Sequence, residues 1–369
     1  MRVLLIARPW SFHGGIETAT AGLLRALVEH GDDVQLLTPG EPPPVPGVTV
    51  RRLWIPPLPA PARVFAFAAL ARRAAARERR DVVQSHERTF GADVYRAGEG
   101  CHRAYLELRD ERASRPLYHR AVLAVERRVF QETRAIVAIA RKGKEEIERL
   151  YGVAPTRVTT VYNGVDLVRF HPDNRGRHRE AARTEAAIPH DAFTALYVGS
   201  GFARKGLGTA IEALAKLADR RARLVVIGRG DERAFRALAD RLGLAAQIAW
   251  LGPRRDVERW YAAADAAILP ARYEPFGNVH LEALASGTPV VTSTRAGGSE
   301  VVQEGVSGAV REPRDAAGFA EALAHLQASP ERDRARAARA AAEPFTYERQ
   351  VKELHRIWAE ISRATPDFP

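Results

Sequence analysis

Short apolar runs alternate with amphipathic segments along most of the chain. Clear apolar runs occupy residues 2–7, 34–38, 135–140, 193–201 and 267–270. Such runs, with little polar alternation, are typical of parallel strands that are buried on both faces. Helical apolar spacing is found between and after them, at residues 18–29, 62–80, 142–151, 232–242, 315–327 and 345–363. The pattern predicts an α/β protein that opens with the β-loop-α unit of a nucleotide-binding fold.

The length of 369 residues favours two domains, because single hydrophobic cores stop growing below this size. A polar, basic and turn-rich stretch at residues 167–190 is the expected linker. No apolar run approaches the roughly 20 residues that a membrane-spanning helix needs, and the first run is too short for a secretion signal. The single cysteine, Cys101, excludes an intramolecular disulfide, so we expect a cytoplasmic protein.

The formal net charge of +11 is concentrated in the first half of the chain. Residues 1–165 hold 26 Lys and Arg against 18 Asp and Glu. Such an excess can attract nucleic acid, an anionic membrane or a phosphorylated substrate, or it can reflect a general arginine bias. Residues 103–130 are basic and carry aromatic side chains, which suits a helix at an anionic membrane surface as well as a solvated helix packed through its apolar stripe.

The most informative stretch runs from residue 265 to residue 300. After the apolar run 267–270 comes a loop with Glu274, and Asn278 is placed to cap a short helix that contains Glu282. The backbone N–H groups of Phe276, Gly277 and Asn278 can face an anion at the start of this helix. Two carboxylates are thus expected beside one anion cradle, just past a strand end where ligands bind.

This stretch resembles the donor-sugar signature of retaining glycosyltransferases of the GT-B fold, family four. The spacing between Glu274 and Glu282 matches the family pattern, and the strand that begins with Pro289-Val-Val follows as expected. The resemblance implies two Rossmann-like, doubly wound domains that face a cleft. It places an acceptor-binding domain at residues 1–170, a nucleotide-sugar-binding domain at 171–345, and a terminal helix, 346–369, that crosses back to the first domain.

The resemblance also implies roles for the donor-site residues. Glu282 would bind the ribose hydroxyls, Glu274 the sugar hydroxyls, and Arg204 with Lys205 the charge that develops on UDP. The remaining donor-binding candidates are backbone or edge positions, namely Gly15, Gly199, Arg254, Phe276, Gly277 and Asn278. The absence of an Asp-x-Asp motif implies that no metal and no further cofactor assists the diphosphate.

Acceptor-binding candidates lie in the first domain. They are Gly14 in a glycine loop, His86 and His102 near strand ends, and Glu99, which is also a catalytic candidate because it occupies the slot of a histidine near the transferred sugar. An acid at that slot resembles the WaaG-type lipopolysaccharide core glucosyltransferases.

The resemblance therefore implies glucose transfer from UDP-glucose to an inner-core heptose, at the cytoplasmic membrane face and without a nucleic-acid partner. Another glycolipid or polysaccharide acceptor remains an alternative. A protein of a different class is also an alternative: a non-catalytic basic protein that binds nucleic acid or membrane.

Overall fold

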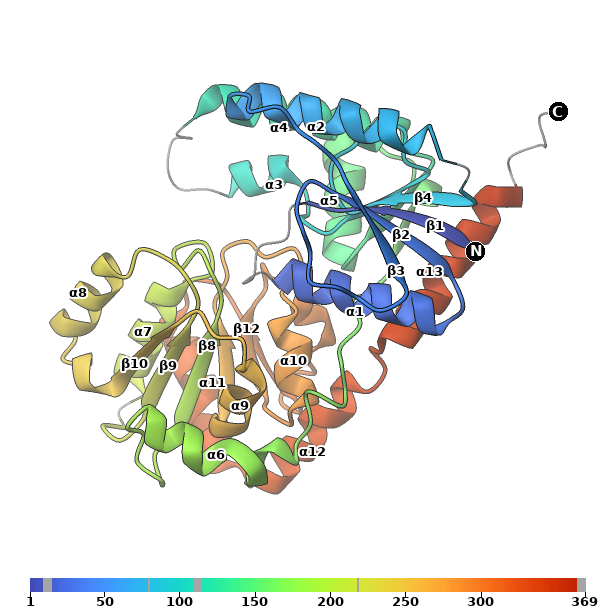
Figure 1. Cartoon of the computed structure of the whole chain (residues 1–369). Helices are drawn as coiled ribbons and strands as arrows, with labels where there is room; N and C mark the ends of the chain where they lie inside the picture. Colours follow the sequence, from blue (N-terminus) through green and yellow to red (C-terminus); the bar gives the residue numbers. More distant parts are fainter. Residues whose placement is uncertain (9–14, 79, 109–114, 218, 364–369) are drawn as a thin grey trace. The chain divides into compact units, whose positions relative to one another are not determined.

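The computed structural model describes residues 1–8, 15–78, 80–108, 115–217 and 219–363. It divides into two compact units (Figure 1). The first unit contains residues 1–8, Ile16–Gly164 and the terminal helix α13, Tyr347–Arg363. The second unit contains Val165–Thr346 and, of the other described residues, Gly15. The chain thus passes from the first unit to the second near residue 165 and returns just before α13.

The first unit is built on a seven-stranded parallel sheet with the order β3-β2-β1-β4-β5-β6-β7. The order reverses between β1 and β4, which is the switch point where Rossmann-like folds bind ligands at the carboxyl ends of their strands. The strands are β1 (Arg2–Ile6), β2 (Asp33–Thr38), β3 (Val48–Arg52), β4 (Val82–Ser85), β5 (Val94–Ala97), β6 (Ala135–Ala138) and β7 (Val158–Thr160).

Helices cover both faces of this sheet. On one face, apolar side chains of α1 and α13 pack on β1 and β2, and Trp358 of α13 is fully buried there. On the other face, α2 packs on β1 and against α4 (Figure 1). Besides α13 and a 3₁₀ turn at Pro155–Arg157, the helices are α1 (Gly15–Glu29), α2 (Ala60–Ala75), α3 (His102–Glu107), α4 (Pro116–Glu132) and α5 (Arg141–Tyr151).

The second unit repeats this plan with a six-stranded parallel sheet of order β10-β9-β8-β11-β12-β13. Its switch point lies between β8 and β11. The strands are β8 (Thr194–Val198), β9 (Arg223–Ile227), β10 (Ile248–Gly252), β11 (Ala266–Leu269), β12 (Val290–Ser293) and β13 (Gly308–Arg311). Two parallel sheets of this topology confirm the predicted pair of Rossmann-like, doubly wound domains.

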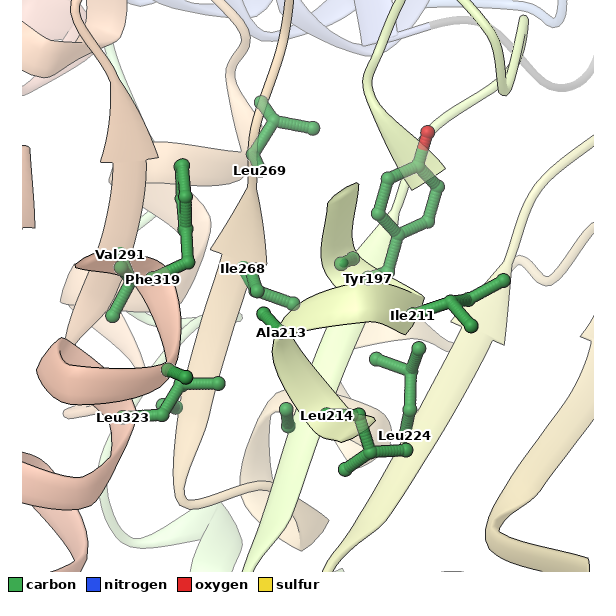
Figure 2. Close-up of a cluster of buried hydrophobic side chains, with 14 of the residues drawn as sticks. Tyr197, Ile211, Ala213, Leu214, Leu224, Ile268, Leu269, Val291, Phe319 and Leu323 are labelled. Carbon is green, nitrogen blue, oxygen red and sulfur yellow. The ribbon is translucent and has the colours of Figure 1, made fainter. Parts of the chain in front are cut away.

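The core of the second unit lies under α7 and α11. Side chains such as Ile211 and Leu214 of α7 and Phe319 and Leu323 of α11 meet the strand side chain Ile268 (Figure 2). On the opposite face, α6 packs on α9, and α10 packs on α12. Besides the 3₁₀ turns at Ala245–Gln247 and Gly297–Val301, the helices are α6 (Asn174–Glu185), α7 (Leu207–Lys216), α8 (Arg233–Arg241), α9 (Val257–Ala263), α10 (Val279–Ala285), α11 (Ala316–Ala328) and α12 (Glu331–Ala342).

The predicted linker at residues 167–190 is wrong for most of its length, because α6 lies within it. This helix is anchored by charge rather than by an apolar stripe. Arg175, Arg179 and Arg183 all reach the buried carboxylate of Asp265, at 2.8, 2.9 and 2.9 Å. Arginines four residues apart share one helix face. Their spacing therefore indicated a helix here, although the polar composition suggested a linker.

Three further expectations need correction. Helix α2 ends at Ala75 rather than continuing to residue 80. The basic stretch 103–130 forms two helices, α3 and α4, rather than one, with residues 109–114 outside the described part. Asn278 precedes α10 as expected, but its side chain makes no capping hydrogen bond, because its backbone is already helical.

None of the described helices is both long enough and apolar enough to cross a membrane.

Candidate active site

The loop after β11 carries Glu274 and is held in place by the segment that follows β12. The N–H of Gly297 donates to the carbonyl of Glu274 at 2.8 Å, and the N–H of Gly298 donates to the carbonyl of Phe276 at 2.8 Å. Glu274 also forms a parallel bridge with Ala296. Gly297 and Gly298 therefore hold the Glu274 loop in place through backbone hydrogen bonds.

Arg204 and Lys205, just past β8, both bind the carboxylate of Glu274. Lys205 Nζ lies 3.0 Å and Arg204 Nη1 lies 3.2 Å from Glu274 Oε2. Arg204 Nη1 also donates to the carbonyl of Tyr273 at 2.7 Å. Burial alone would raise the pKa of Glu274, but the charges of Lys205 and Arg204 outweigh it and lower the pKa to about 2. Glu274 is thus an anion between two cations at the switch point.

Two glycines allow the loops that carry Arg204, Lys205 and Glu274 to lie close together. Gly206 has a φ of +76°, and a Cβ on it would overlap the carbonyl oxygen of Pro270 at the end of β11. Gly277 has a φ of +81°, where an L side chain would be strained and would meet Glu274 and His280. Gly199, another predicted donor-site position, lies at the end of β8 against the aliphatic part of the Lys205 side chain.

Helix α10 starts at this loop and carries Glu282 in its first turn. The buried Glu282 carboxylate accepts a hydrogen bond from the hydroxyl of Tyr261 at 3.0 Å. Burial raises the pKa of Glu282, although the Tyr261 hydrogen bond opposes the rise. The two glutamates of the motif are therefore held differently, one by cations and the other by a neutral hydroxyl.

His280 is a site residue that the sequence analysis did not single out. Its Nδ1 lies 2.6 Å from the carbonyl of Gly277, and its Nε2 lies 2.7 Å from the hydroxyl of Thr292. Burial lowers the pKa of His280 to about 4, so the ring is neutral and carries one N–H. A carbonyl can only accept, so Nδ1 donates to Gly277 and the unprotonated Nε2 faces the Thr292 hydroxyl, which also lies 3.2 Å from the carbonyl of Leu269. His280 thus fixes the turn at Gly277, and a histidine two residues before Glu282 in a short, mostly apolar helix was the available signal.

The remaining predicted donor-site residues lie in different surroundings. Arg254 follows β10 and forms ion pairs with Glu185 at 2.8 Å and Asp256 at 3.0 Å. Gly15 is the first residue of α1, and Gly14 lies outside the described residues. Phe276 is buried in the loop, and its carbonyl accepts from Gly298.

In the first unit, Glu99 lies beyond β5 within a network of charged side chains. Arg88 Nη1 is 2.6 Å from Glu99, and Arg8 pairs with both Glu99 and Glu87. Burial opposes ionisation of Glu99, but the adjacent arginines prevail and lower its pKa, whereas burial and the charge of Glu99 raise the pKa of Glu87. Arg88 also contacts the buried carboxylate of Glu126 at 2.7 Å. Glu99 is therefore an engaged anion, suited to binding rather than to proton transfer.

The two predicted histidines of the first unit are placed differently. His86, just past β4, is buried between Thr20 and Gln84, and burial lowers its pKa well below the usual value. His102 begins α3, and its Nε2 lies 2.9 Å from Nδ1 of His119 on α4. Burial lowers the pKa of His102 to about 4. Both rings are therefore neutral hydrogen-bonding groups near neutral pH.

Arg96 at the end of β5 is a further feature that the sequence did not predict. It is 4% exposed, and its Nη2 donates to Asn163 at 2.5 Å. Its Nε has no hydrogen-bond partner, and among the described residues the groups that oppose the effect of burial on its charge are tyrosines rather than carboxylates. Burial lowers its pKa to about 10. A buried guanidinium without an anionic partner is costly, which makes it a candidate contact for an anionic ligand.

Comparison with known proteins identifies the family of this chain. A model for glycosyl transferases group 1 matches residues 178–343, and a model for Glycosyltransferase Family 4 matches residues 13–169. A D-inositol 3-phosphate glycosyltransferase from Geodermatophilus obscurus is 33% identical over 381 residues, which cover 92% of this chain and 83% of the relative. The chain belongs to the group 1 glycosyltransferases. This membership argues against the alternative of a non-catalytic basic binding protein.

Other relatives and solved structures extend the comparison. D-inositol 3-phosphate glycosyltransferase 1 from Catenulispora acidiphila is 36% identical over 226 residues, so the chain spans about half the length of this relative, 53%. WaaG, a glycosyltransferase involved in lipopolysaccharide biosynthesis, has a TM-score of 0.83 at 25% identity, covering 96% of this chain and 99% of WaaG. The Anabaena protein Alr3699/HepE in complex with UDP-glucose has a TM-score of 0.76 at 18% identity, covering 98% and 100%. The predicted GT-B fold and group 1 family are confirmed, whereas most of the relatives by sequence carry inositol 3-phosphate names rather than lipopolysaccharide names.

Proposed function

We propose that this glycosyltransferase moves a hexose from a UDP-sugar to an acceptor hydroxyl with retention of anomeric configuration. The observation that carries the proposal is the pairing of Arg204 and Lys205 with Glu274 at the β8–β11 switch point. Two adjacent cations suit a diphosphate, Arg through its fork of donors and Lys as a point charge. A carboxylate beside them suits the hydroxyls of the attached sugar.

The proposed chemistry is electrostatic stabilisation of the leaving group. As the bond between the sugar and UDP breaks, negative charge grows on the diphosphate, and Arg204 and Lys205 are already in place to meet it. Glu274 balances these cations and would bind sugar hydroxyls once the diphosphate pairs with Arg204 and Lys205. Glu282, steadied by Tyr261, would accept hydrogen bonds from the ribose. We propose that no divalent metal and no other cofactor is needed, because two side-chain cations supply the charge.

Retention requires attack from the leaving-group face or a transient sugar–enzyme bond. We favour the first route. Glu274 is ion-paired and has a pKa lowered to about 2, which makes its carboxylate a weak nucleophile. The acceptor hydroxyl can instead pass its proton to the departing diphosphate.

For the acceptor we propose a phosphorylated polyol of the inositol phosphate class. Two observations support it. The relatives that match most of the chain are named for inositol 3-phosphate, and Arg96 is a buried cation whose Nε has no hydrogen-bond partner and on which no carboxylate acts in the described residues. The inner-core heptose of lipopolysaccharide is the second candidate, supported by the similarity to WaaG. In either case Glu99, His86 and His102 are proposed to line the acceptor side, and an anionic membrane surface is proposed only for the glycolipid acceptor.

A transfer assay separates these acceptors. Purified full-length protein is given UDP-glucose or UDP-N-acetylglucosamine in EDTA, with either inositol 3-phosphate or a heptose-containing core oligosaccharide, and the product linkage is read by NMR. We expect an α-linked product with inositol 3-phosphate and little with unphosphorylated inositol. A β-linked product would contradict retention, and equal transfer to unphosphorylated inositol would contradict the anionic acceptor.

A further inference from the structure

A cluster of metal-binding side chains lies in the first unit, apart from its strand carboxyl ends. His30 follows α1, Asp32 precedes β2, and His355 lies in the middle of α13. Since β1 pairs with β2 through Arg2 and Asp33, the cluster is at the amino ends of these strands. Residues such as Glu99 lie beyond the carboxyl ends of the same sheet, so this cluster does not belong to the candidate active site.

The donor atoms of the three side chains converge. His355 Nε2 lies 2.8 Å and His30 Nδ1 lies 3.7 Å from Oδ2 of Asp32. All three ligand atoms lie within 4.8 Å of one another. A tetrahedral zinc ion with bonds of about 2.1 Å separates its ligand atoms by about 3.4 Å, so small side-chain rotations bring all three into range. In the described part of the chain, no other group of His, Cys, Asp and Glu converges in this way.

The surroundings hold these side chains in position. The Asp32 side chain is 1% exposed, and its Oδ1 accepts from the amino group of Met1 at 2.8 Å, which directs Oδ2 toward the histidines. The His355 ring packs against the rings of His30 and Trp358, with centroids 4.4 and 4.9 Å apart. Hydrogen bonds that orient ligating groups are a usual feature of protein metal sites.

We propose that His30, Asp32 and His355 bind a divalent transition-metal ion, with zinc as the best match. Two imidazoles and one carboxylate suit zinc, whereas magnesium and calcium take oxygen ligands. The ion would join α13 to the turn between α1 and β2, two parts of the first unit that are far apart in the sequence. Its role is therefore structural, as a clamp on the terminal helix, and it is independent of the proposed transfer reaction.

The test is zinc binding by the full-length chain after its purification tag has been removed. The protein is stripped with EDTA, dialysed and titrated with ZnCl₂ by calorimetry, with MgCl₂ as the comparison ion. We expect one zinc site per chain, no comparable magnesium binding, and a rise in Tm with zinc. The variants His30→Gln and His355→Gln should each weaken zinc binding by at least about 100-fold. His325→Gln, an exposed histidine on α11, is the matched control and should bind as the parent does.

His30→Gln keeps the test decisive if His355→Gln fails to fold. The His30 side chain is 39% exposed and makes no hydrogen bond to Asp32 at 3.7 Å, so the loss of its packing on His355 should lower the Tm in EDTA only slightly. Cobalt substitution gives an independent readout, since tetrahedral cobalt absorbs visible light strongly. Zinc affinity that is the same in the parent and in His30→Gln, or a parent that binds no zinc, would overturn the proposal.

Discussion

Two roles are proposed for the Glu274 carboxylate, namely balancing the charge of Arg204 and Lys205 and binding the sugar hydroxyls. The substitution Glu274→Gln separates them. It removes the negative charge between Arg204 and Lys205 while keeping the shape of the side chain. The lowering of the Glu274 pKa from 4.5 to about 2 corresponds to about 3 kcal/mol in favour of the charged carboxylate. UDP must displace part of this interaction when its diphosphate binds the same cations.

The variant should therefore bind UDP more tightly than the parent, by about tenfold if roughly half of this energy is recovered. Transfer should fall by at least about 100-fold, because an amide replaces the carboxylate that binds the sugar hydroxyls. Calorimetry with UDP and a transfer assay measure the two effects separately. Glu321→Gln, an exposed acid on α11, is the control and should change neither. The reasoning is refuted if UDP affinity falls in parallel with transfer.

Three further predictions concern the framework of the second unit. Gly298→Ala should reduce transfer by at least about tenfold with a higher KM for the donor, since the new Cβ would lie 2.5 Å from the Phe276 carbonyl and closer still to the His280 ring. Arg183→Ala should destabilise the second unit by about 3 kcal/mol in urea unfolding, because this buried side chain pairs with Asp265. The Glu274 carboxylate should stabilise the folded state above about pH 4.5, and this contribution should be lost as the pH falls toward 2; unfolding curves for Glu274→Gln should lack it.

Matched controls exist for two of these variants. Gly176→Ala, in α6, places a Cβ where nothing lies within 4 Å and should leave donor KM unchanged. Arg221→Ala removes an ion pair with Asp191 in which both side chains are more than half exposed, so it should change stability by less than about 1 kcal/mol. A Gly176→Ala defect as large as that of Gly298→Ala would contradict the proposed role of the backbone contact.

The sequence predicted those features that depend on local patterns. Strands that are buried on both faces appear as apolar runs in the sequence, so the strands of both parallel sheets could be predicted from the sequence alone. The Glu274 motif is likewise continuous in sequence. The resemblance to the glycosyltransferase family implied that Arg204 and Lys205 belong to the same donor site, and the structure pairs both side chains with Glu274.

Features that depend on tertiary contacts were missed. Helix α6 lacks an apolar stripe, and its stability comes from Asp265, which lies far along the chain from its arginines. The contact of His280 with the Gly277 carbonyl depends on the bend of the Glu274 loop. Glu99 was predicted to contact the acceptor or the sugar, but its ion pairs with Arg8 and Arg88, which come from two other strand ends, were not predicted. Charge pairing across strands leaves no local pattern in the sequence.

The central claim is that Arg204 and Lys205 bind the diphosphate of a UDP-sugar without a metal. Calorimetric titration with UDP in EDTA tests it most directly, using the parent chain, Arg204→Ala and Lys205→Ala. We predict one site per chain in the parent that persists in EDTA, and a loss of at least about tenfold in affinity for each variant. No UDP binding by the parent at millimolar concentration, or binding that needs magnesium, would contradict the account.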